Sequence, residues 1–269
     1  MRKIWPSSWG PRMDHVLRNS LYALLEREGS TLPDILRLYR DKDFRKHVAA
    51  NIRNPVVRQF WIGEFEKYPP RLQGEAVAPI QNKIGALLTD PMLYRVLVEP
   101  AVDLRFRRMM DDGDVLLVNL ARGRIGEESS NILGSLLVST LGVAAFSRAE
   151  VSGERRPFFL YVDEFHNFTT LSFATMMAEL RKYGVGLILA HQYLEQLLPE
   201  VRAAVLGNAA TFLSFRVGAT DAQSLSAEFE PRFTPLDLMN LPNRHFYLRL
   251  MIDGTPSVPF SGKLVPEVG

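Results

Sequence analysis

The chain has 269 residues, 46% hydrophobic and 23% charged, so it is long enough to bury one large core or two smaller ones. Its 18 glycines and 17 prolines show no period, which excludes collagen-like and low-complexity proteins. The absence of cysteine excludes a disulfide framework, a thiolate zinc site and a cysteine nucleophile. The net charge of +2 is small, but residues 1–113 carry 19 Lys and Arg against 14 Asp and Glu. This excess of cations mildly favours a polyanionic partner.

Between residues 11 and 112, apolar residues recur almost throughout at the helical period. This pattern predicts an all-α region, which we place at residues 1–112. Glycine and proline mark the breaks between its helices. Two apolar stripes at helical spacing predict core positions, with Ser30 or Thr31 as the N-cap of the second. The stripes are Val16, Leu17, Leu21, Leu24 and Leu25, and then Leu32, Ile35, Leu36 and Tyr39.

The pattern changes at Gly113, where short runs of aliphatic residues begin to alternate with helical stretches. Alternation of strand and helix predicts an α/β fold with a mainly parallel sheet flanked by helices over residues 113–269. A final run, 245–252, is expected to pair antiparallel at an edge or to form a hairpin with 257–264. The expected parallel strands are 114–120, 158–162, 186–190 and 211–217, and the expected helices are 127–148, 171–183 and 194–208.

The longest nearly apolar run, Ile132–Phe146, is shorter than the roughly 18–20 residues that cross a bilayer. We therefore expect a buried helix there and no membrane segment. The N-terminal residues lack the continuous apolar stretch of a signal peptide, so a cytoplasmic location is expected.

Two adjacent carboxylates follow the strand expected at 158–162. Four or more apolar residues followed by Asp163-Glu164 form the Walker B pattern of P-loop ATPases. In that pattern the Asp holds Mg²⁺ and the Glu polarises the water that attacks the γ-phosphate. The alternative is a strand that simply ends in solvated acids.

The next expected strand ends in His191-Gln192, at the same edge of the same sheet. An amide at this position is suited to sensing a γ-phosphate or orienting a water. Between the two strands, Arg181 and Lys182 precede Gly184, and these cations either interact with the helix dipole or serve a neighbouring site.

Four segments in this order resemble the C-terminal part of the HerA/FtsK-type P-loop motor ATPases, and most closely the TraG/TraD-like type IV coupling proteins of conjugation and type IV secretion. The resemblance covers most of residues 113–265, and the helical half resembles the all-α insertion of such coupling proteins. The segments are Leu-Tyr-Val-Asp-Glu-Phe (160–165), Arg-Lys-Tyr-Gly (181–184), Leu-Ala-His-Gln (189–192) and Gly-Asn-Ala-Ala-Thr (207–211).

The resemblance implies a RecA-like ATPase that uses ATP and Mg²⁺. It implies Asp163 as the Mg²⁺ ligand, Glu164 as the catalytic carboxylate and Gln192 as the sensor. Arg181 matches the arginine finger that reaches the nucleotide of the adjacent subunit in a hexameric ring that moves DNA. Residues 114–128 also resemble this group, and there Arg122 and Arg124 are expected to face phosphate or the neighbouring subunit.

One departure from the family pattern is important. The 269 residues contain no Gly-x-x-x-x-Gly-Lys-Ser/Thr, the loop whose N–H groups and lysine hold the triphosphate. We therefore expect the downstream portion of a longer motor, inactive alone and an ATPase when joined to its Walker A part. A missing N-terminal anchor would place such a motor at the inner face of the membrane.

Two other classes of function stay open at this stage. In a metal hydrolase, the ligands would be Asp163, Glu164, His166 and His191. In a non-enzymatic module, the chain would only bind DNA or a partner protein. The candidates for DNA contact are Arg37, Arg40, Arg45 and Lys46, for which the alternative is a solvated charged face.

Overall fold

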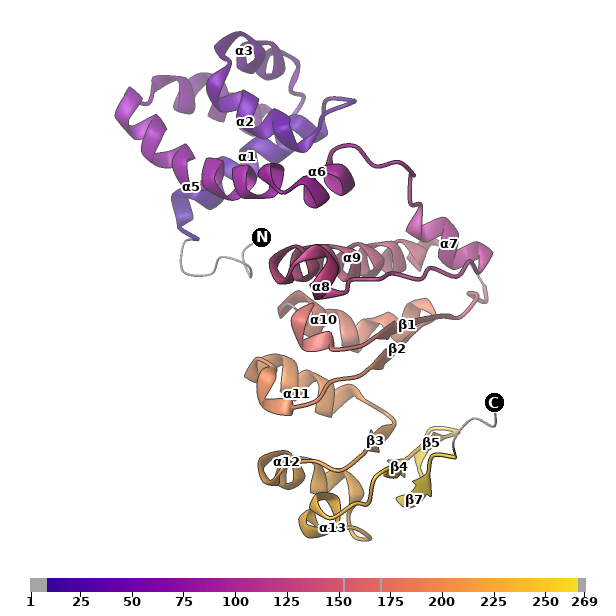
Figure 1. The fold of residues 1–269 in the computed structure, drawn as a ribbon. Coiled ribbons are helices and arrows are strands. Elements are labelled where there is room, and N and C mark those ends of the chain that lie inside the picture. The colour runs from indigo at the N-terminus through magenta and orange to yellow at the C-terminus, as the bar shows by residue number, and fades with distance from the viewer. Residues whose placement is uncertain (1–8, 152, 170, 266–269) are drawn as a thin grey trace. The chain divides into compact units, whose positions relative to one another are not determined.

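The computed structural model describes residues 9–151, 153–169 and 171–265 (Figure 1). The chain forms two compact units. Residues 1–104 and 119–133 form one, here the helical unit, and residues 105–118 and 134–269 form the other, here the sheet unit. Residues 105–112, which we assigned to the all-α region, therefore belong to the sheet unit.

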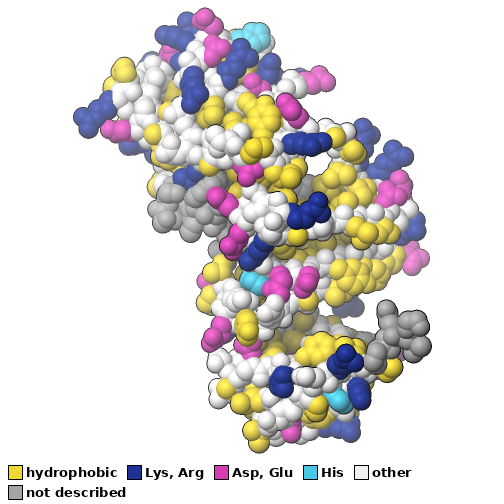
Figure 2. Space-filling view, viewed as in Figure 1, with side chains coloured by type: hydrophobic (Ala, Val, Ile, Leu, Met, Phe, Trp, Pro, Cys, Tyr) yellow, Lys and Arg dark blue, Asp and Glu magenta, His cyan; other side chains and the backbone are white. Residues whose placement is uncertain are grey.

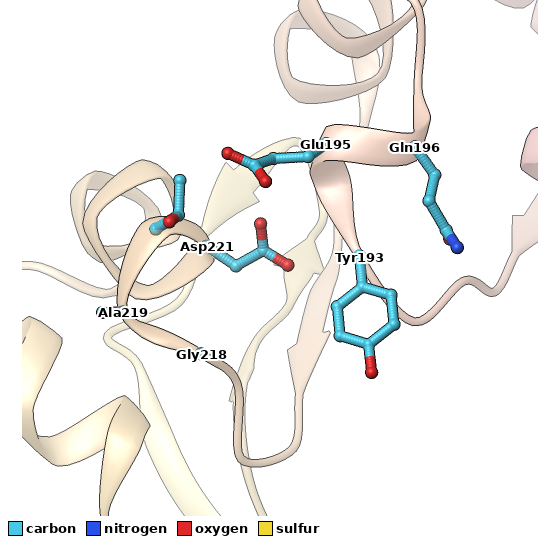
Figure 3. A pocket seen from close by; sticks show the side chains of 7 residues that line it. Tyr193, Glu195, Gln196, Gly218, Ala219 and Asp221 are labelled. Atoms are coloured by element: carbon cyan, nitrogen blue, oxygen red, sulfur yellow. The ribbon is translucent and has the colours of Figure 1, made fainter.

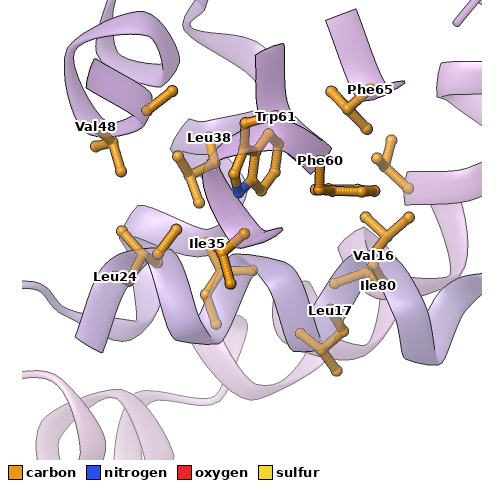
Figure 4. Packing of buried hydrophobic residues seen from close by; sticks show 14 of the residues in the cluster. Val16, Leu17, Leu24, Ile35, Leu38, Val48, Phe60, Trp61, Phe65 and Ile80 are labelled. Atoms are coloured by element: carbon orange, nitrogen blue, oxygen red, sulfur yellow. The ribbon is translucent and has the colours of Figure 1, made fainter. Parts of the chain in front are cut away.

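The helical unit is built around a core of aromatic and branched side chains. Trp61, Phe60 and Phe65 pack together at its centre, and α1 contributes Val16 and Leu17 (Figure 4). Its helices are α1 (Pro11–Leu25), α2 (Leu32–Arg40), α3 (Lys42–Asn51), α4 (Pro55–Gln59), a π-helical turn (Phe60–Glu64), a 3-10 turn (Phe65–Lys67), α5 (Pro70–Thr89), α6 (Pro91–Leu97) and α8 (Arg122–Ile125).

The stripes expected in this unit are confirmed in part. Thr31 begins α2 with a capping box, in which its backbone N–H donates to Asp34 at 2.9 Å. Leu21 and Leu25, however, are 41% and 79% exposed, so the stripe of α1 is narrower than expected. One helix buries only the face that its neighbours cover, and these two leucines lie beside that face.

The sheet unit alternates strands with helices. A two-stranded parallel sheet, β1 (Phe158–Val162) with β2 (Val185–Leu189), pairs Val162 with Leu189. A second sheet has the antiparallel order β3 (Phe212–Ser214), β4 (His245–Arg249), β7 (Phe260–Lys263), and β5 (Met251–Ile252) pairs with β6 (Thr255–Pro256). The helices are α7 (Phe106–Asp112), α9 (Glu127–Ser147, which begins in residues of the helical unit), α10 (Leu171–Leu180), α11 (Pro199–Asn208), α12 (Ala219–Phe229) and α13 (Pro235–Met239).

The prediction of a mainly parallel sheet is therefore correct only in part. β1 and β2 are parallel as predicted, and the antiparallel pairing of β4 with the segment after it is confirmed. The segment 114–120 forms no strand, and β3 pairs with β4 instead of joining the parallel sheet. A strand exists only where a neighbouring strand shares its hydrogen bonds, and within the described part of the chain no backbone hydrogen bond joins 114–120 to another strand.

The apolar run 132–146 lies within a longer helix than expected. By length and composition alone, the helical stretch Glu127–Glu150 can cross a membrane, and 39% of its most apolar window is buried. Core helices pass the same test. Val138, Leu141 and Ala145 pack into the core of the sheet unit, which confirms burial for that face, whereas Val143 on another face is 66% exposed.

A buried arginine ties four segments of the sheet unit together. Arg148 is 1% exposed, and its guanidinium donates to Asp111 Oδ1 at 3.0 Å, to the Tyr183 carbonyl at 2.9 Å and to the Arg156 carbonyl at 2.6 Å. These bonds join α7, the end of α9, the turn before β2 and the approach to β1. A guanidinium is suited to this position because its donors diverge in a fixed plane.

Candidate active site

Backbone hydrogen bonds continue to join the two chain segments after the carboxyl ends of β1 and β2. The Ala190 N–H donates to the Val162 carbonyl at 3.0 Å, and the Phe165 N–H donates to the Ala190 carbonyl at 3.1 Å. The ladder thus continues on both sides of Asp163 and Glu164. This pairing brings the two acids and Gln192 to one edge of the sheet, as the pattern predicts.

Glu164 has an unusual backbone conformation. Its φ of 48° lies in the left-handed region, which for a residue other than glycine costs of order 1–3 kcal/mol. Its N–H donates to Asp163 Oδ1 at 2.9 Å. The turn directs the Glu164 side chain to the neighbouring strand end, and strain of this kind is concentrated at functional sites.

Two side chains flank the Glu164 carboxylate. The Gln192 amide donates from Nε2 to Glu164 Oε1 at 2.6 Å, and His166 Nδ1 lies 3.4 Å from Oε2. The carboxylate is 36% exposed, so it is fixed in orientation and still open to water. Such a carboxylate can orient a water molecule and accept its proton.

Asp163 next to it is exposed and offers hard oxygen donors, the ligand type that Mg²⁺ prefers. One or two carboxylates plus water suffice for this ion, so the residue fits the expected role. A larger metal centre does not fit. Among the described residues there is no group of three or more His, Cys, Asp or Glu side chains that could hold a metal. The described residues thus do not assemble the four ligands that the metal-hydrolase hypothesis names, and His191 packs its ring edge-on against Phe165 at 5.0 Å.

Arg181 lies at the other edge of the sheet. It begins the 3-10 turn Arg181–Tyr183, which ends at Gly184 in the left-handed conformation (φ 74°) just before β2. Five residues of β2 separate this turn from the Glu164 edge, roughly 16 Å at about 3.3 Å per residue. The side chain is exposed, and the structure does not bring it to the carboxylates of its own chain.

Arg122 and Arg124 lie on α8, in the helical unit. Both are exposed, and Arg122 Nη1 is 3.3 Å from Glu127 Oε1. Arg122 thus has a partner within its own unit, and the two arginines belong to a different unit from Glu164.

The four candidates for DNA contact differ in their surroundings. Arg40 and Lys46 are exposed, and Arg37 is exposed but pairs with Asp41 at 3.1 Å. Arg45 is only 7% exposed, donates to the Leu38 carbonyl at 2.9 Å and pairs with Glu66 at 3.2 Å. The expectation that Arg45 faces DNA is therefore corrected, because its charge serves the interior of the helical unit.

Sequence reasoning missed a cavity of about 370 Å³ at the carboxyl ends of β2 and β3. The residues after β2 and the start of α12 line it, and Glu195 and Asp221 enter it from opposite sides (Figure 3). Asp221 is buried, and its Oδ2 accepts the Leu194 N–H at 3.1 Å. In the sequence, the signal that could have indicated this cavity was the set of polar residues that follow β2 and β3. The lining residues are Tyr193, Glu195, Gln196, Gly218, Ala219, Thr220 and Asp221.

Residues 157–229 match the family model described as the TraM recognition site of TraD and TraG. The matched segment contains Asp163, Glu164, Arg181 and Gln192. The resemblance to the C-terminal portion of TraG/TraD-like type IV coupling proteins is confirmed. No curated protein matches the chain.

Solved structures with a similar fold include the plasmid coupling protein TrwB in complex with a non-hydrolysable GTP analogue, at 14% identity and a TM-score of 0.61. They also include the unbound TrwBdeltaN70 form of this bacterial conjugative coupling protein, at 15% identity and a TM-score of 0.64. Both matches cover 93% of this chain and 62% of the TrwB chain. The chain thus shares the fold of a part of TrwB and spans less than two thirds of its length.

Proposed function

We propose that this chain is the C-terminal portion of a ring-forming, ATP-driven motor that moves DNA in conjugation or type IV secretion. It contributes the Walker B acids, the sensor Gln192 and the arginine finger Arg181. Its family match and the TrwB-like fold support a coupling-protein region, and TrwB structures with nucleotide analogues support nucleotide binding.

The observation that carries this proposal is the hydrogen bond from Gln192 to Glu164. It joins two strand ends that are 28 residues apart in sequence and orients a half-exposed carboxylate at the edge where a parallel sheet binds its ligand. A strand that merely ended in solvated acids would not need an amide from its neighbour.

Within the motor, the site residues have distinct proposed roles. Asp163 would hold Mg²⁺, which supplies neutralising charge on the phosphate oxygens when bound. Glu164 orients the attacking water and accepts its proton, while Gln192 keeps that carboxylate in place. Arg122 and Arg124 are proposed to contact phosphate or the next subunit.

The proposed position of Arg181 is at the subunit interface. Its exposed position at the amino end of β2, away from Glu164 of its own chain, supports a role in which it reaches the nucleotide of a neighbouring subunit in a hexameric ring. Such a motor would act in the cytoplasm, at the inner face of the membrane when an upstream anchor is present.

The experiment that tests the function uses the chain joined to the upstream part that carries the Walker A loop. Glu164→Gln should retain Mg-ATP binding and lose turnover by at least ~10², because water-activating residues contribute ~10²–10⁴. Glu179→Gln, at a partly exposed acid on α10 that pairs with Lys182, is the matched control and should keep turnover. Near-normal turnover in Glu164→Gln would reject the proposal.

The chain of 269 residues alone should hydrolyse no ATP and bind it weakly, because no residue run in it forms the phosphate-binding loop. Calorimetric titration with Mg-ATP checks this. Micromolar affinity together with turnover would require a phosphate site elsewhere in the chain.

DNA is the proposed substrate of the motor, and the exposed cations Arg37, Arg40 and Lys46 of the helical unit are its proposed contacts. Binding should be independent of sequence and fall steeply with salt, as counterion release requires. The double variant Arg40→Glu/Lys46→Glu should flatten the salt slope, whereas Arg58→Glu on α4 should not. An unchanged slope in the double variant would make these residues a solvated face.

The family description favours a second function, recognition of a partner protein. The matched model, over residues 157–229, is described as the TraM recognition site of TraD and TraG. We propose that this segment also binds a TraM-type protein, as a non-enzymatic module would. Titration of the chain with purified TraM should give saturable binding, and its absence would leave only the motor role.

A further inference from the structure

Two arginines bind the backbone of the 3-10 turn Arg181–Tyr183, which we call the finger turn. This turn lies between α10 and β2. Arg155 donates from Nη1 to the Lys182 carbonyl at 3.4 Å, and Arg148 donates from Nη1 to the Tyr183 carbonyl at 2.9 Å. The two residues directly after the exposed arginine of the turn are therefore each held at the carbonyl by a guanidinium.

Arg155 directs all of its donor nitrogens to backbone carbonyls. Besides the Lys182 carbonyl, it donates from Nε to the Arg148 carbonyl at 2.9 Å and from Nη2 to the Val151 carbonyl at 3.2 Å. Within the described part of the chain its guanidinium has no carboxylate partner. Hydrogen bonds from a charged donor are stronger than neutral ones, so this side chain fastens the finger turn to the segment that follows α9.

The other contacts of the finger turn leave Arg181 as its free side chain. Leu180 before the turn is 3% exposed, and the Tyr183 ring packs edge-on against Phe146 at 5.3 Å. Lys182 pairs with an acid of α10 at 3.8 Å. Arg181 is exposed, and no carboxylate among the described residues pairs with it. The backbone of the turn is thus fixed on both sides of a side chain that is open to a partner.

The surroundings of the finger turn are rich in cations. Figure 2 shows Lys and Arg side chains gathered where Figure 1 places α7. Asp111 of this helix lies near the turn, because Arg148 bonds to both, but it is already shared by Arg148 and Arg107. These surroundings therefore offer Arg181 no free acid of α7 at this place and favour an anion that comes from outside the unit.

We propose that Arg155 is a positioning residue for Arg181, whose guanidinium it presents at one fixed place by holding the finger turn. The inference rests on the proposed role of Arg181 as the arginine finger of a neighbouring nucleotide site. A group that stabilises a transition state has to be placed accurately, since a misplacement of about 1 Å can cost about 10²-fold in rate. Arg155 itself touches no nucleotide in this proposal, and its effect on turnover passes through Arg181 alone.

Amide hydrogen exchange of the 269-residue chain, resolved by NMR, tests the hold on the finger turn without ATP. The Gly184 N–H closes the turn on the Arg181 carbonyl at 3.1 Å. Arg155→Met keeps a long side chain and removes its donors, so exchange of the Gly184 amide should become at least ~10-fold faster. The Ala190 amide, bonded to the Val162 carbonyl at the far end of β2, is the internal control and should not change.

Turnover of the motor joined to its Walker A part tests the positioning role. Arg155→Met should lower kcat by at least ~10-fold and leave the Kd for Mg-ATP unchanged, because a finger acts on the transition state. Added to Arg181→Ala, it should cause less than a ~2-fold further loss, whereas independent effects would multiply. Arg155→Lys, which retains one donor group, should recover part of kcat. Arg156→Met is the matched control and should keep turnover, since this exposed arginine donates to the Asp112 carbonyl and not to the finger turn.

The outcomes separate this role from the proposed function. Unchanged Gly184 exchange or unchanged kcat in Arg155→Met overturns the positioning role while the motor function stands, and so does a full further loss in the double variant. Normal turnover in Arg181→Ala overturns both the finger and its positioning residue. A joined motor that hydrolyses no ATP rejects the proposed function, and Gly184 exchange then decides by itself whether Arg155 fixes the turn.

Discussion

Replacing Arg148 with methionine tests whether one buried guanidinium holds the sheet unit together. The substitution keeps a long apolar side chain and removes all three donors. The Tyr183 and Arg156 carbonyls then lose a partner, at about 1–3 kcal/mol each, while Asp111 keeps its pair with Arg107 at 2.6 Å. Breaking a buried ion pair costs a similar total, about 3–5 kcal/mol, so we expect a loss in this range.

Urea unfolding measures this loss separately for the two units. The sequence of the sheet unit contains none of the three tryptophans, which are at positions 5, 9 and 61, so tryptophan fluorescence reports the unfolding of the helical unit, where Trp61 lies in the core. Far-UV circular dichroism reports both units. In Arg148→Met, the sheet-unit transition should move down by about 2 M urea if the slope is about 2 kcal/mol per M. The tryptophan transition should keep its midpoint.

Two further variants make the result decisive. Arg108→Met removes an exposed ion pair within α7, the helix that also carries Asp111. The Arg108 side chain is 72% exposed and lies 3.0 Å from Asp112, so the free energy of unfolding should fall by about 0.5 kcal/mol or less. Arg148→Lys, which retains one donor group, should fall between this control and Arg148→Met. A loss below about 1 kcal/mol in Arg148→Met would refute the reasoning.

Four more outcomes are expected. Gly134→Ala should destabilise the sheet unit by about 1–3 kcal/mol in thermal melts, because the new methyl would lie 2.2 Å from the Phe168 ring. Gly85→Ala on α5, with open space around it, should instead stabilise by about 0.5–1 kcal/mol. The Ser129 hydroxyl, with two backbone N–H groups, holds the pKa of Asp90 below its ordinary value. This carboxylate therefore stabilises the fold above about pH 4, and its contribution to the free energy of unfolding is lost as the pH falls through its folded pKa. In Ser129→Ala the free energy of unfolding should fall less between pH 7 and pH 3 than in the unmodified chain. Parallel curves for both proteins would contradict this. Finally, in rings of the joined motor, Arg181→Ala subunits mixed with subunits lacking the Walker A lysine should regain part of their ATPase activity, and no recovery at any ratio would exclude a role in trans.

The alternation of short apolar runs with helical stretches determined the β1–α10–β2–α11 order, because a strand buried on its faces and a helix have different periods. The sequence also determined where the candidate site lies. Polar residues directly after two parallel strands must meet at one edge, and Glu164 and Gln192 do so at 2.6 Å.

Only the tertiary structure decided which segments find partners. The run 114–120 has the composition of a strand, yet Val115 and Leu117 are 84% and 90% exposed, because a strand needs a neighbour that its own residues do not specify. Arg45 and Arg37 lie on neighbouring helices of one basic region, but only the fold places Arg45 beside Glu66 and inside the core. Burial and pairing depend on segments far away in the chain, and a local pattern cannot contain that information.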